Sequence, residues 1–299
     1  MAEHHHHHHD HHHHRPQAGS ALGVAAALTL VFAGLEALGG WWTGSLALLS
    51  DAGHMLTDGA ALALGAFAAW MARRPPSARH SYGLGRAEIF AALVNAVTML
   101  AIVGALAYEA MARLQDPDPA IKGGWAALIA LAGLALNLVL LRRLAPHGHD
   151  MNARAAMLHV MGDALGSVAA LVSGLVVALS GWTPADPIAS LVIGTLIAVS
   201  AVRLTRESVH ALMEGVPRGL SMEAIGREMA AVEGVHSVHD LHVWALSGSR
   251  TALSAHVVVE SMADWHLTLD ALQRRLHLRF GIDHVTLQPE SGVRPLIRH

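Results

Sequence analysis

The segment SDAGHMLTDGAAL, residues 50–62, places three ionisable side chains in an otherwise apolar stretch of the chain. Between Arg15 and Arg73 the only charged side chains are Glu36, Asp51 and Asp58. An aspartate at the centre of a membrane helix costs about 2.5 to 3.5 kcal/mol on insertion scales, so a purely structural role there would be unusual. The segment therefore predicts a transmembrane helix whose acidic side chains have partners.

The composition of the whole chain is typical of a membrane protein. Of its 299 residues, 53% are hydrophobic and 14% are charged, and the mean hydropathy is +0.39, which is far from the profile of a soluble domain. The net charge of −3 argues against a nucleic-acid partner, which would favour a basic surface. Because the chain has no cysteine, a metal site would have to use His, Asp, Glu or backbone oxygen.

Six apolar runs are close to the roughly 20 residues that a transmembrane helix needs, and Gly, Pro or charged residues separate them. Buried helices of a large soluble protein are the alternative, which six successive runs with so few charges disfavour. The predicted spans run from Ala18 to Gly40, Ser45 to Ala72, Ala87 to Leu114, Trp125 to Leu141, Ala153 to Gly181 and Pro187 to Thr205.

The arginines predict the orientation of these spans. Loop 73–86 carries four arginines and segment 142–154 carries three, whereas the first and fifth loops carry no Lys or Arg. By the positive-inside rule, the two arginine-rich loops and both termini face the cytoplasm. The second and fifth spans are therefore expected to run in opposite directions.

Changes in composition along the chain predict three domains. Residues 1–17 hold a run of histidines that cannot form a core, and this run is either a native, disordered metal-binding tail or an expression tag. Residues 18–213 form the six-helix transmembrane domain. Residues 214–299 show patterns in the order helix-strand-strand-helix-strand, which predicts a small ferredoxin-like α+β cytoplasmic domain.

Histidine and aspartate have the same spacing in two of the predicted spans. His54 and Asp58 are four residues apart in the second span, as are His159 and Asp163 in the fifth, so each pair lies on one face of its helix. Single polar residues in membrane helices often serve as hydrogen bonds between helices. That role gives no reason for the spacing to repeat, so we expect the four side chains to meet.

Two imidazoles and two carboxylates from two helices would make a site with four ligands. Zn²⁺ accepts tetrahedral sites of His and Asp at about 2.0 to 2.2 Å, whereas Mg²⁺ and Ca²⁺ prefer oxygen ligands. Zn²⁺ is therefore the expected ion. Cd²⁺, Co²⁺, Fe²⁺ and Mn²⁺ are alternatives that the ligand types leave open.

Four stretches of the sequence resemble the cation diffusion facilitator family, in its bacterial zinc, cadmium and cobalt efflux branch. They are SLALLSDAGHMLTDGAAL, HSYGLGRAEIFAALVNA, HVMGDALGS and HDLHVWAL. The resemblance implies a homodimeric metal cation/proton antiporter of the bacterial inner membrane, not an enzyme, that exports divalent metal from the cytoplasm by alternating access. The transport ligands that it implies are His54, Asp58, His159 and Asp163.

Proton coupling is expected from the ligands themselves. Metal binding needs neutral histidine and ionised aspartate, so protons and Zn²⁺ compete for the same atoms. His54 and His159 are the expected proton carriers, because histidine titrates in the physiological range. Asp51 is either an entry or proton-relay group nearer the outer face, or a residue that caps the second span or pairs with a neighbour. Glu36 is expected to form a hydrogen bond between helices.

The resemblance also implies further zinc in the cytoplasmic domain, at the dimer interface. The candidate ligands there are His239, His256, His266, Gln288 and Glu290. Gln288 and Glu290 stand where the better-known sites have His and Asp, so the ligand set is altered. His80, in the loop after the second span, is the candidate for a separate loop site.

Two other classes of protein could use the same ligands. A membrane metalloenzyme would need an open coordination position and a general base or nucleophile, and the sequence has no H-E-x-x-H motif. A membrane metal sensor would use the cytoplasmic domain to report metal occupancy without transport. A measurement of metal flux separates both from a transporter.

Overall fold

The computed structural model describes residues 16–115, 121–145, 151–248 and 250–291. The histidines of the predicted tail lie outside these residues. The chain divides into two compact units, one of Met1–Gly59 with Met99–Val199 and the other of Ala60–Thr98 with Ser200–His299.

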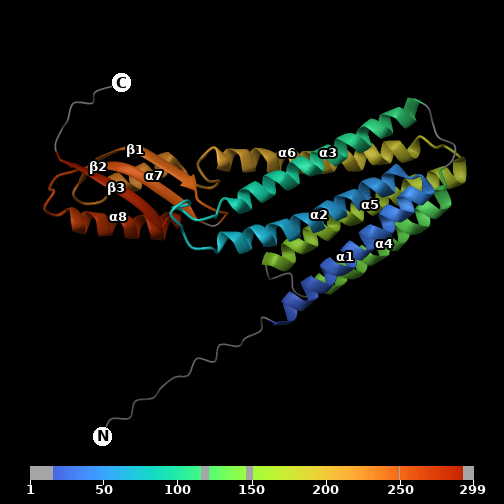
Figure 1. The fold of residues 1–299 in the computed structure, drawn as a ribbon, viewed down its shortest axis with the longest axis horizontal. Coiled ribbons are helices and arrows are strands. Elements are labelled where there is room, and N and C mark those ends of the chain that lie inside the picture. Colours follow the sequence, from blue (N-terminus) through green and yellow to red (C-terminus); the bar gives the residue numbers. More distant parts are fainter. Residues whose placement is uncertain (1–15, 116–120, 146–150, 249, 292–299) are drawn as a thin grey trace, which may run out of the picture. The chain divides into compact units, whose positions relative to one another are not determined.

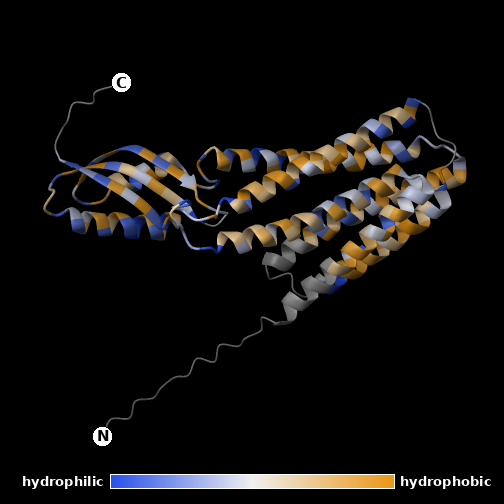
Figure 2. Ribbon diagram, viewed as in Figure 1, coloured by the Kyte–Doolittle hydropathy of each residue, from blue (hydrophilic) through white to orange (hydrophobic). Residues whose placement is uncertain are grey.

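The apolar runs form long helices (Figure 1), and these helices are largely hydrophobic along their length (Figure 2). Five of them, α2 to α6, are long and apolar enough to cross a membrane. The prediction of six spans is confirmed for these five, and a crossing by α1 stays a prediction. The helices are α1 Pro16–Thr43, α2 Leu46–Ala72, α3 Ala87–Gln115, α4 Gly123–Leu144, α5 Met151–Ser180 and α6 Ala185–Leu212.

Helix α2 begins at a buried carboxylate from another helix. Asp186, at the start of α6 and 1% exposed, accepts a hydrogen bond from Ser45 Oγ at 2.5 Å. It also accepts from the backbone N–H groups of Leu46 and Ala47, at 2.6 and 3.4 Å. These N–H groups lie in the first turn of α2, where no carbonyl of the helix can accept from them, and the carboxylate complements the positive end of the helix dipole. Asp186 therefore caps the start of α2 together with Ser45, whose Oγ accepts from the N–H of Leu48 at 3.2 Å.

Helices α4 and α5 pack closely through glycines. A Cβ atom added at Gly174 would lie 2.7 Å from the backbone nitrogen of Ala127, and one added at Gly123 would lie 2.7 Å from that of Ala178. Small residues at such positions let helix backbones approach each other in membranes. This contact supports α5, which carries one of the two H-x-x-x-D motifs.

The elements of the small domain follow one another in the predicted order. They are α7 Met222–Ala230, β1 Val235–Ala245, β2 Thr251–Val259, α8 Trp265–Phe280 and β3 His284–Ser291. Strands β1 and β2 pair antiparallel, whereas β2 and β3 pair parallel, in the order β1-β2-β3. A small sheet with helices is therefore confirmed. Its described strands are one fewer than the four of a full ferredoxin-like unit.

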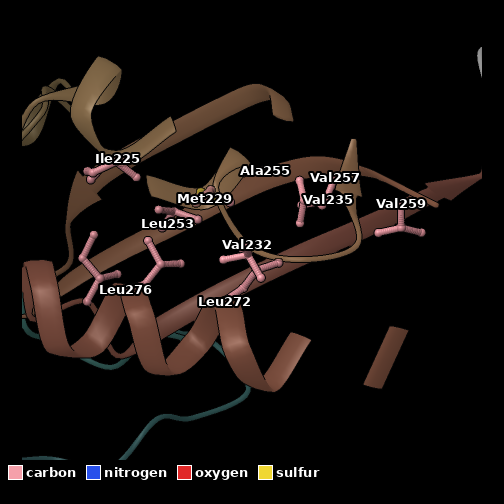
Figure 3. Packing of buried hydrophobic residues seen from close by; sticks show 12 residues of the cluster. Ile225, Met229, Val232, Val235, Leu253, Ala255, Val257, Val259, Leu272 and Leu276 are labelled. Atoms are coloured by element: carbon pink, nitrogen blue, oxygen red, sulfur yellow. The ribbon is translucent and has the colours of Figure 1, made fainter. Parts of the chain in front are cut away.

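One face of this sheet forms the core of the small domain with α7 and α8. Leu253, Ala255 and Val257 alternate along β2 and are at most 2% exposed. Leu272 and Leu276 extend from α8 toward the same face (Figure 3). Burying each leucine contributes roughly 1.5 to 3 kcal/mol. Because neighbouring side chains of a strand point to opposite faces, the residues of β2 between these three lie on the face away from this core.

Candidate metal sites

Four side chains of helices α2 and α5 form a ring in which imidazoles and carboxylates alternate. His54 Nδ1 lies 3.6 Å from Asp58 Oδ2, and His54 Nε2 lies 3.9 Å from Asp163 Oδ1. His159 Nδ1 lies 3.4 Å from Asp58 Oδ2, and His159 Nε2 lies 3.7 Å from Asp163 Oδ2. The structure thus brings together the four side chains of the predicted transport site. Their role as metal ligands stays a prediction.

The pairing across the ring follows the expected antiparallel direction of α2 and α5. Asp58 faces His159 and His54 faces Asp163. One turn further, Ser167 Oγ donates a hydrogen bond to Asp51 Oδ2 at 3.0 Å. Residue numbers therefore run in opposite directions along the two helices: lower numbers on α2 face higher numbers on α5. Packing of the two helices in this way brings the two H-x-x-x-D motifs level with each other.

The ring has the composition of a zinc site and nearly the size of one. In a tetrahedron with metal–ligand distances of about 2.0 to 2.2 Å, neighbouring ligand atoms are about 3.3 to 3.6 Å apart. The observed contacts of 3.4 to 3.9 Å are slightly longer. Each imidazole also faces its two carboxylates with different nitrogen atoms. The side chains would therefore have to turn inward for one atom of each to bind the same ion.

Burial within the ring is uneven. The Asp163 side chain is 0% exposed, whereas the His159 side chain is 42% exposed. Neither carboxylate oxygen of Asp163 has a hydrogen-bond partner among the described residues. A buried ionised carboxylate without a partner is strongly unfavourable, and a divalent cation in the ring would supply the missing charge.

Further polar side chains lie beside the ring. Asn137 Nδ2, on α4, donates to Ser167 Oγ at 3.4 Å, and Ser167 in turn donates to Asp51. Asp51 therefore does pair with a neighbouring helix. The hydrogen bond expected for Glu36 is wrong, because neither of its carboxylate oxygens has a partner among the described residues.

A second group of potential ligands lies on the sheet of the small domain. His256 Nδ1 is 2.8 Å from Glu290 Oε1, and His239 Nε2 is 3.0 Å from Glu290 Oε2. One ligand atom from each of these three residues lies within 4.8 Å of the other two, the one such group in the described part of the chain. Hydrogen bonds from His256 and then from His239 hold the pKa of the Glu290 carboxyl below its usual range. This group can converge on a single metal ion.

Asp240 also faces this group, although the sequence pattern did not indicate it. Its Oδ2 atom lies 3.7 Å from His256 Nε2, and a hydrogen bond from His242 to Oδ1 lowers the pKa of its carboxyl. Asp240 has a φ of +50°, where the β1–β2 register shifts between His239 and His242. Such a bulge redirects a side chain. The polar run HDLH, which breaks the alternation of the strand, was the available signal.

Three other predicted ligands lie outside these two arrangements. Gln288 stands opposite His256 in the β2–β3 pairing, but its side chain is exposed. His266 is exposed on α8. His80 lies in a turn where its backbone N–H and C=O pair with Ser77. No cluster of three His, Asp or Glu ligands among the described residues includes His80 or His266, and the role of all three stays a prediction.

Comparison with known proteins covers nearly the whole chain. The sequence profile of the cation efflux transmembrane domain matches residues 22–213, and that of the cytoplasmic domain of cation efflux proteins matches residues 217–292. The chain is 42% identical over 274 residues to the zinc transporter ZitB of Escherichia coli, which covers 90% of this chain and 85% of that protein. It is 36% identical over 263 residues to the cadmium, cobalt and zinc/H(+)-K(+) antiporter of Bacillus subtilis, covering 86% and 84% of the two chains. A solved structure, the metal-bound C-terminal domain of the CzcD transporter from Cuprividus metallidurans, is 35% identical with a TM-score of 0.23, and covers 24% of this chain and 99% of that one.

Proposed function

Because the chain belongs to the cation efflux family, we propose that it exports divalent transition metal, chiefly Zn²⁺, from the cytoplasm in exchange for protons. The relatives carry the names of transporters and antiporters. The chain is accordingly an integral membrane protein and a transporter, not an enzyme.

The ring of His54, Asp58, His159 and Asp163 is the observation on which the proposal rests. Two nitrogen and two oxygen ligand types suit Zn²⁺ better than Mg²⁺ or Ca²⁺. The four side chains lie within 3.4 to 3.9 Å of their neighbours around the ring, so that turning inward would bring one atom of each onto the same ion. The ring joins two helices that run in opposite directions. A movement of one helix against the other would open the ring to either side of the membrane, which is the requirement for alternating access.

Proton coupling follows from the chemistry of the ring. Zn²⁺ binds neutral imidazole and ionised carboxylate, so binding releases protons and protonation expels the metal. His54 and His159 would carry the exchanged protons, because imidazole titrates near neutral pH. Asp51, one turn away along α2, is a further candidate proton carrier.

The arginine-rich loops support an orientation with both termini in the cytoplasm. The bacterial inner membrane is the proposed location, because the relatives are bacterial transporters. The cytoplasmic domain would then lie on the side from which metal is exported. A homodimer is proposed because residues 217–292 match the cytoplasmic domain of the family, and the group of His239, His256 and Glu290 is the proposed structural Zn²⁺ site of that domain.

Transport by the purified protein in vesicles tests the proposal. Liposomes with an acidic interior and a trapped zinc-sensitive dye should accumulate Zn²⁺ above its external concentration as protons leave. Asp58→Ala should abolish this accumulation. Glu109→Ala is the matched control, since Glu109 is an acidic residue of α3 that pairs with Arg113 instead of facing the ring.

The same vesicles separate the competing functions. Zinc flux that is indifferent to the pH gradient would contradict proton coupling. Metal binding without any flux would contradict transport and support a metal sensor. Parallel runs with Cd²⁺, Co²⁺, Fe²⁺ and Mn²⁺ identify the preferred substrate.

A further inference from the structure

Four buried oxygen-bearing side chains from four helices gather beside the ring of α2 and α5. They are Glu36 of α1, Asp51 of α2, Asn137 of α4 and Ser167 of α5, and each is at most 1% exposed. Ser167 Oγ donates to Asp51 Oδ2 at 3.0 Å and is itself 3.4 Å from Asn137 Nδ2. We call these residues the oxygen cluster.

Several oxygen atoms of the oxygen cluster have no hydrogen-bond partner among the described residues. They are both carboxylate oxygens of Glu36, Oδ1 of Asp51 and Oδ1 of Asn137. No ion pair to Lys, Arg or His involves Glu36 or Asp51 in the described ranges. Glu36 lies one turn after Phe32 on α1, and a Cβ atom added at Gly133 of α4 would lie 2.7 Å from Phe32 Cε1 and 3.3 Å from Ser167 Oγ, so this part of α1 borders the cluster. Helix α4 contributes the neutral Asn137.

Two carboxylates cannot both stay ionised and unpaired inside a membrane protein. Burying one such charge without a partner is strongly unfavourable, and a second carboxylate nearby adds repulsion. A purely structural pair would be expected to use its oxygens as hydrogen-bond acceptors, yet Glu36 uses neither. The negative charge of the oxygen cluster is therefore neutralised only when the cluster holds a cation.

The type of ligand separates the oxygen cluster from the ring. Its unpartnered atoms are all oxygens, without a nitrogen or sulfur ligand, and such a set suits protons and hard cations more than Zn²⁺. The carboxylate of Asp51 also packs directly against the backbone at Gly166 of α5, because a Cβ atom added at this glycine would collide with it. The absence of a side chain at Gly166 thus makes room for the carboxylate.

The position of the oxygen cluster suggests what its cation does. Asp51 precedes His54 by three residues on α2, and Ser167 follows Asp163 by four on α5. Because these helices are antiparallel, both steps lead away from the ring in the same direction, toward the end of the bundle where α2 begins. A cation in the cluster would lie close enough to the ring to repel a divalent ion there.

From these contacts we propose that Glu36, Asp51, Asn137 and Ser167 form a second cation site, which binds a hard monovalent cation that is exchanged for the exported metal. The inference rests on the proposed antiport and adds a binding place for the driving cation beside the histidines of the ring. The shared chemistry is that of a single positive charge held by carboxylate oxygen, whether the cation is a proton, Na⁺ or K⁺. Occupancy of the oxygen cluster and of the ring would exclude each other by electrostatic repulsion.

The experiment measures which cation gradient drives Zn²⁺ uphill in proteoliposomes of the full chain. One arm imposes a pH gradient in buffers free of Na⁺ and K⁺, and two further arms impose a Na⁺ or a K⁺ gradient at equal pH. The arm that drives accumulation in the wild type identifies the cation. If none does, the proposed antiport itself fails, whatever the variants show.

Glu36→Gln and Asp51→Asn test the site, with Glu109→Gln as the matched control. We expect both variants to bind Zn²⁺ up to about tenfold more weakly by calorimetry, because a negative charge beside the ring is lost, while gradient-driven accumulation at saturating Zn²⁺ falls by about tenfold or more. Loss of coupling at saturating Zn²⁺ is an effect that weaker binding or a merely structural role would not produce. Accumulation equal to the wild type in both variants would overturn the proposal.

Ser167→Ala and Glu36→Asp cover the case in which the neutral variants fail to fold. Both keep the charge of the cluster: Ser167→Ala removes the hydroxyl that donates to Asp51, and Glu36→Asp shortens the side chain that carries the carboxylate. We expect a partial loss of coupling, about two- to fivefold, with the driving cation unchanged. Coupling equal to the wild type in both of these milder variants would also overturn the proposal.

Discussion

The ring between helices α2 and α5 and the ligand group on the sheet of the small domain use the same chemistry in opposite settings. Each combines two histidines with carboxylate. In the ring, Asp163 is fully buried and the contacts of 3.4 to 3.9 Å leave the ligand atoms spread. On the sheet, the three residues are partly exposed and Glu290 already bonds both histidines at 2.8 and 3.0 Å.

The difference fits the proposed roles of a transport site at the ring and a structural site on the sheet. Cross-strand pairing places His239 directly opposite His256 on a rigid sheet, so the ligands need little rearrangement. The ring depends instead on the packing of two helices and must close around its ion. A ring that needs movement to bind suits an ion that has to leave again, and a preformed group suits an ion that stays.

The largest expected effect is on the ring. Asp163→Ala removes the buried carboxylate that faces both imidazoles, so zinc accumulation in vesicles should fall by about a hundredfold or more. Binding of Zn²⁺ to the sheet group should persist in calorimetry of the full chain. Transport that survives this substitution would break the distinction between the two regions.

The next effect concerns the sheet group. Glu290→Ala removes the carboxylate shared by His239 and His256, and metal binding there should weaken by about 10- to 100-fold. Calorimetry of the full chain measures the loss, with Glu260→Ala, an exposed acidic residue just beyond β2, as the control. Zinc flux should decline less than in Asp163→Ala, and an equal decline would contradict the separation of roles.

The pH dependence of metal binding sharpens the comparison further. The hydrogen bonds from His256 and His239 lower the pKa of the Glu290 carboxyl. The ionised carboxylate therefore stabilises the folded domain fully above its unfolded pKa of about 4.3, and this stabilisation is lost only as the pH falls through the lowered pKa. Between pH 7.5 and 5.5 the carboxylate stays ionised. We expect metal affinity at the sheet to fall by about tenfold over this interval, because protons compete with metal for the ligand atoms. Calorimetry of Asp163→Ala at the two pH values, which isolates the sheet group, should show the fall.

The smallest effect is on the support of the ring. Asp186→Ala removes the acceptor for Ser45 Oγ and for the first N–H groups of α2, so the protein should lose about 1 to 2 kcal/mol of stability. A lower thermal midpoint in detergent, with zinc affinity reduced less than in Asp163→Ala, is the expected result. Asp270→Ala, an exposed residue of α8, serves as the control.

Local periodicity predicted most of the fold. Spans of apolar residues became α2 to α6, and alternating residues became β1 to β3, because such patterns depend on neighbours along the chain. The same holds for the two H-x-x-x-D motifs, since a spacing of four places two side chains on one helix face wherever that helix packs.

The sequence by itself determined which two helices carry the H-x-x-x-D motifs and that each motif lies on one helix face. Only the tertiary structure decided that Asp186 of α6 caps α2, that Glu36 is buried without a hydrogen-bond partner among the described residues, and that a bulge turns Asp240 toward His256. The reason is physical. A spacing is a property of one element, whereas a partner on a distant element depends on how the elements pack, and packing is set by the shapes of many side chains at once.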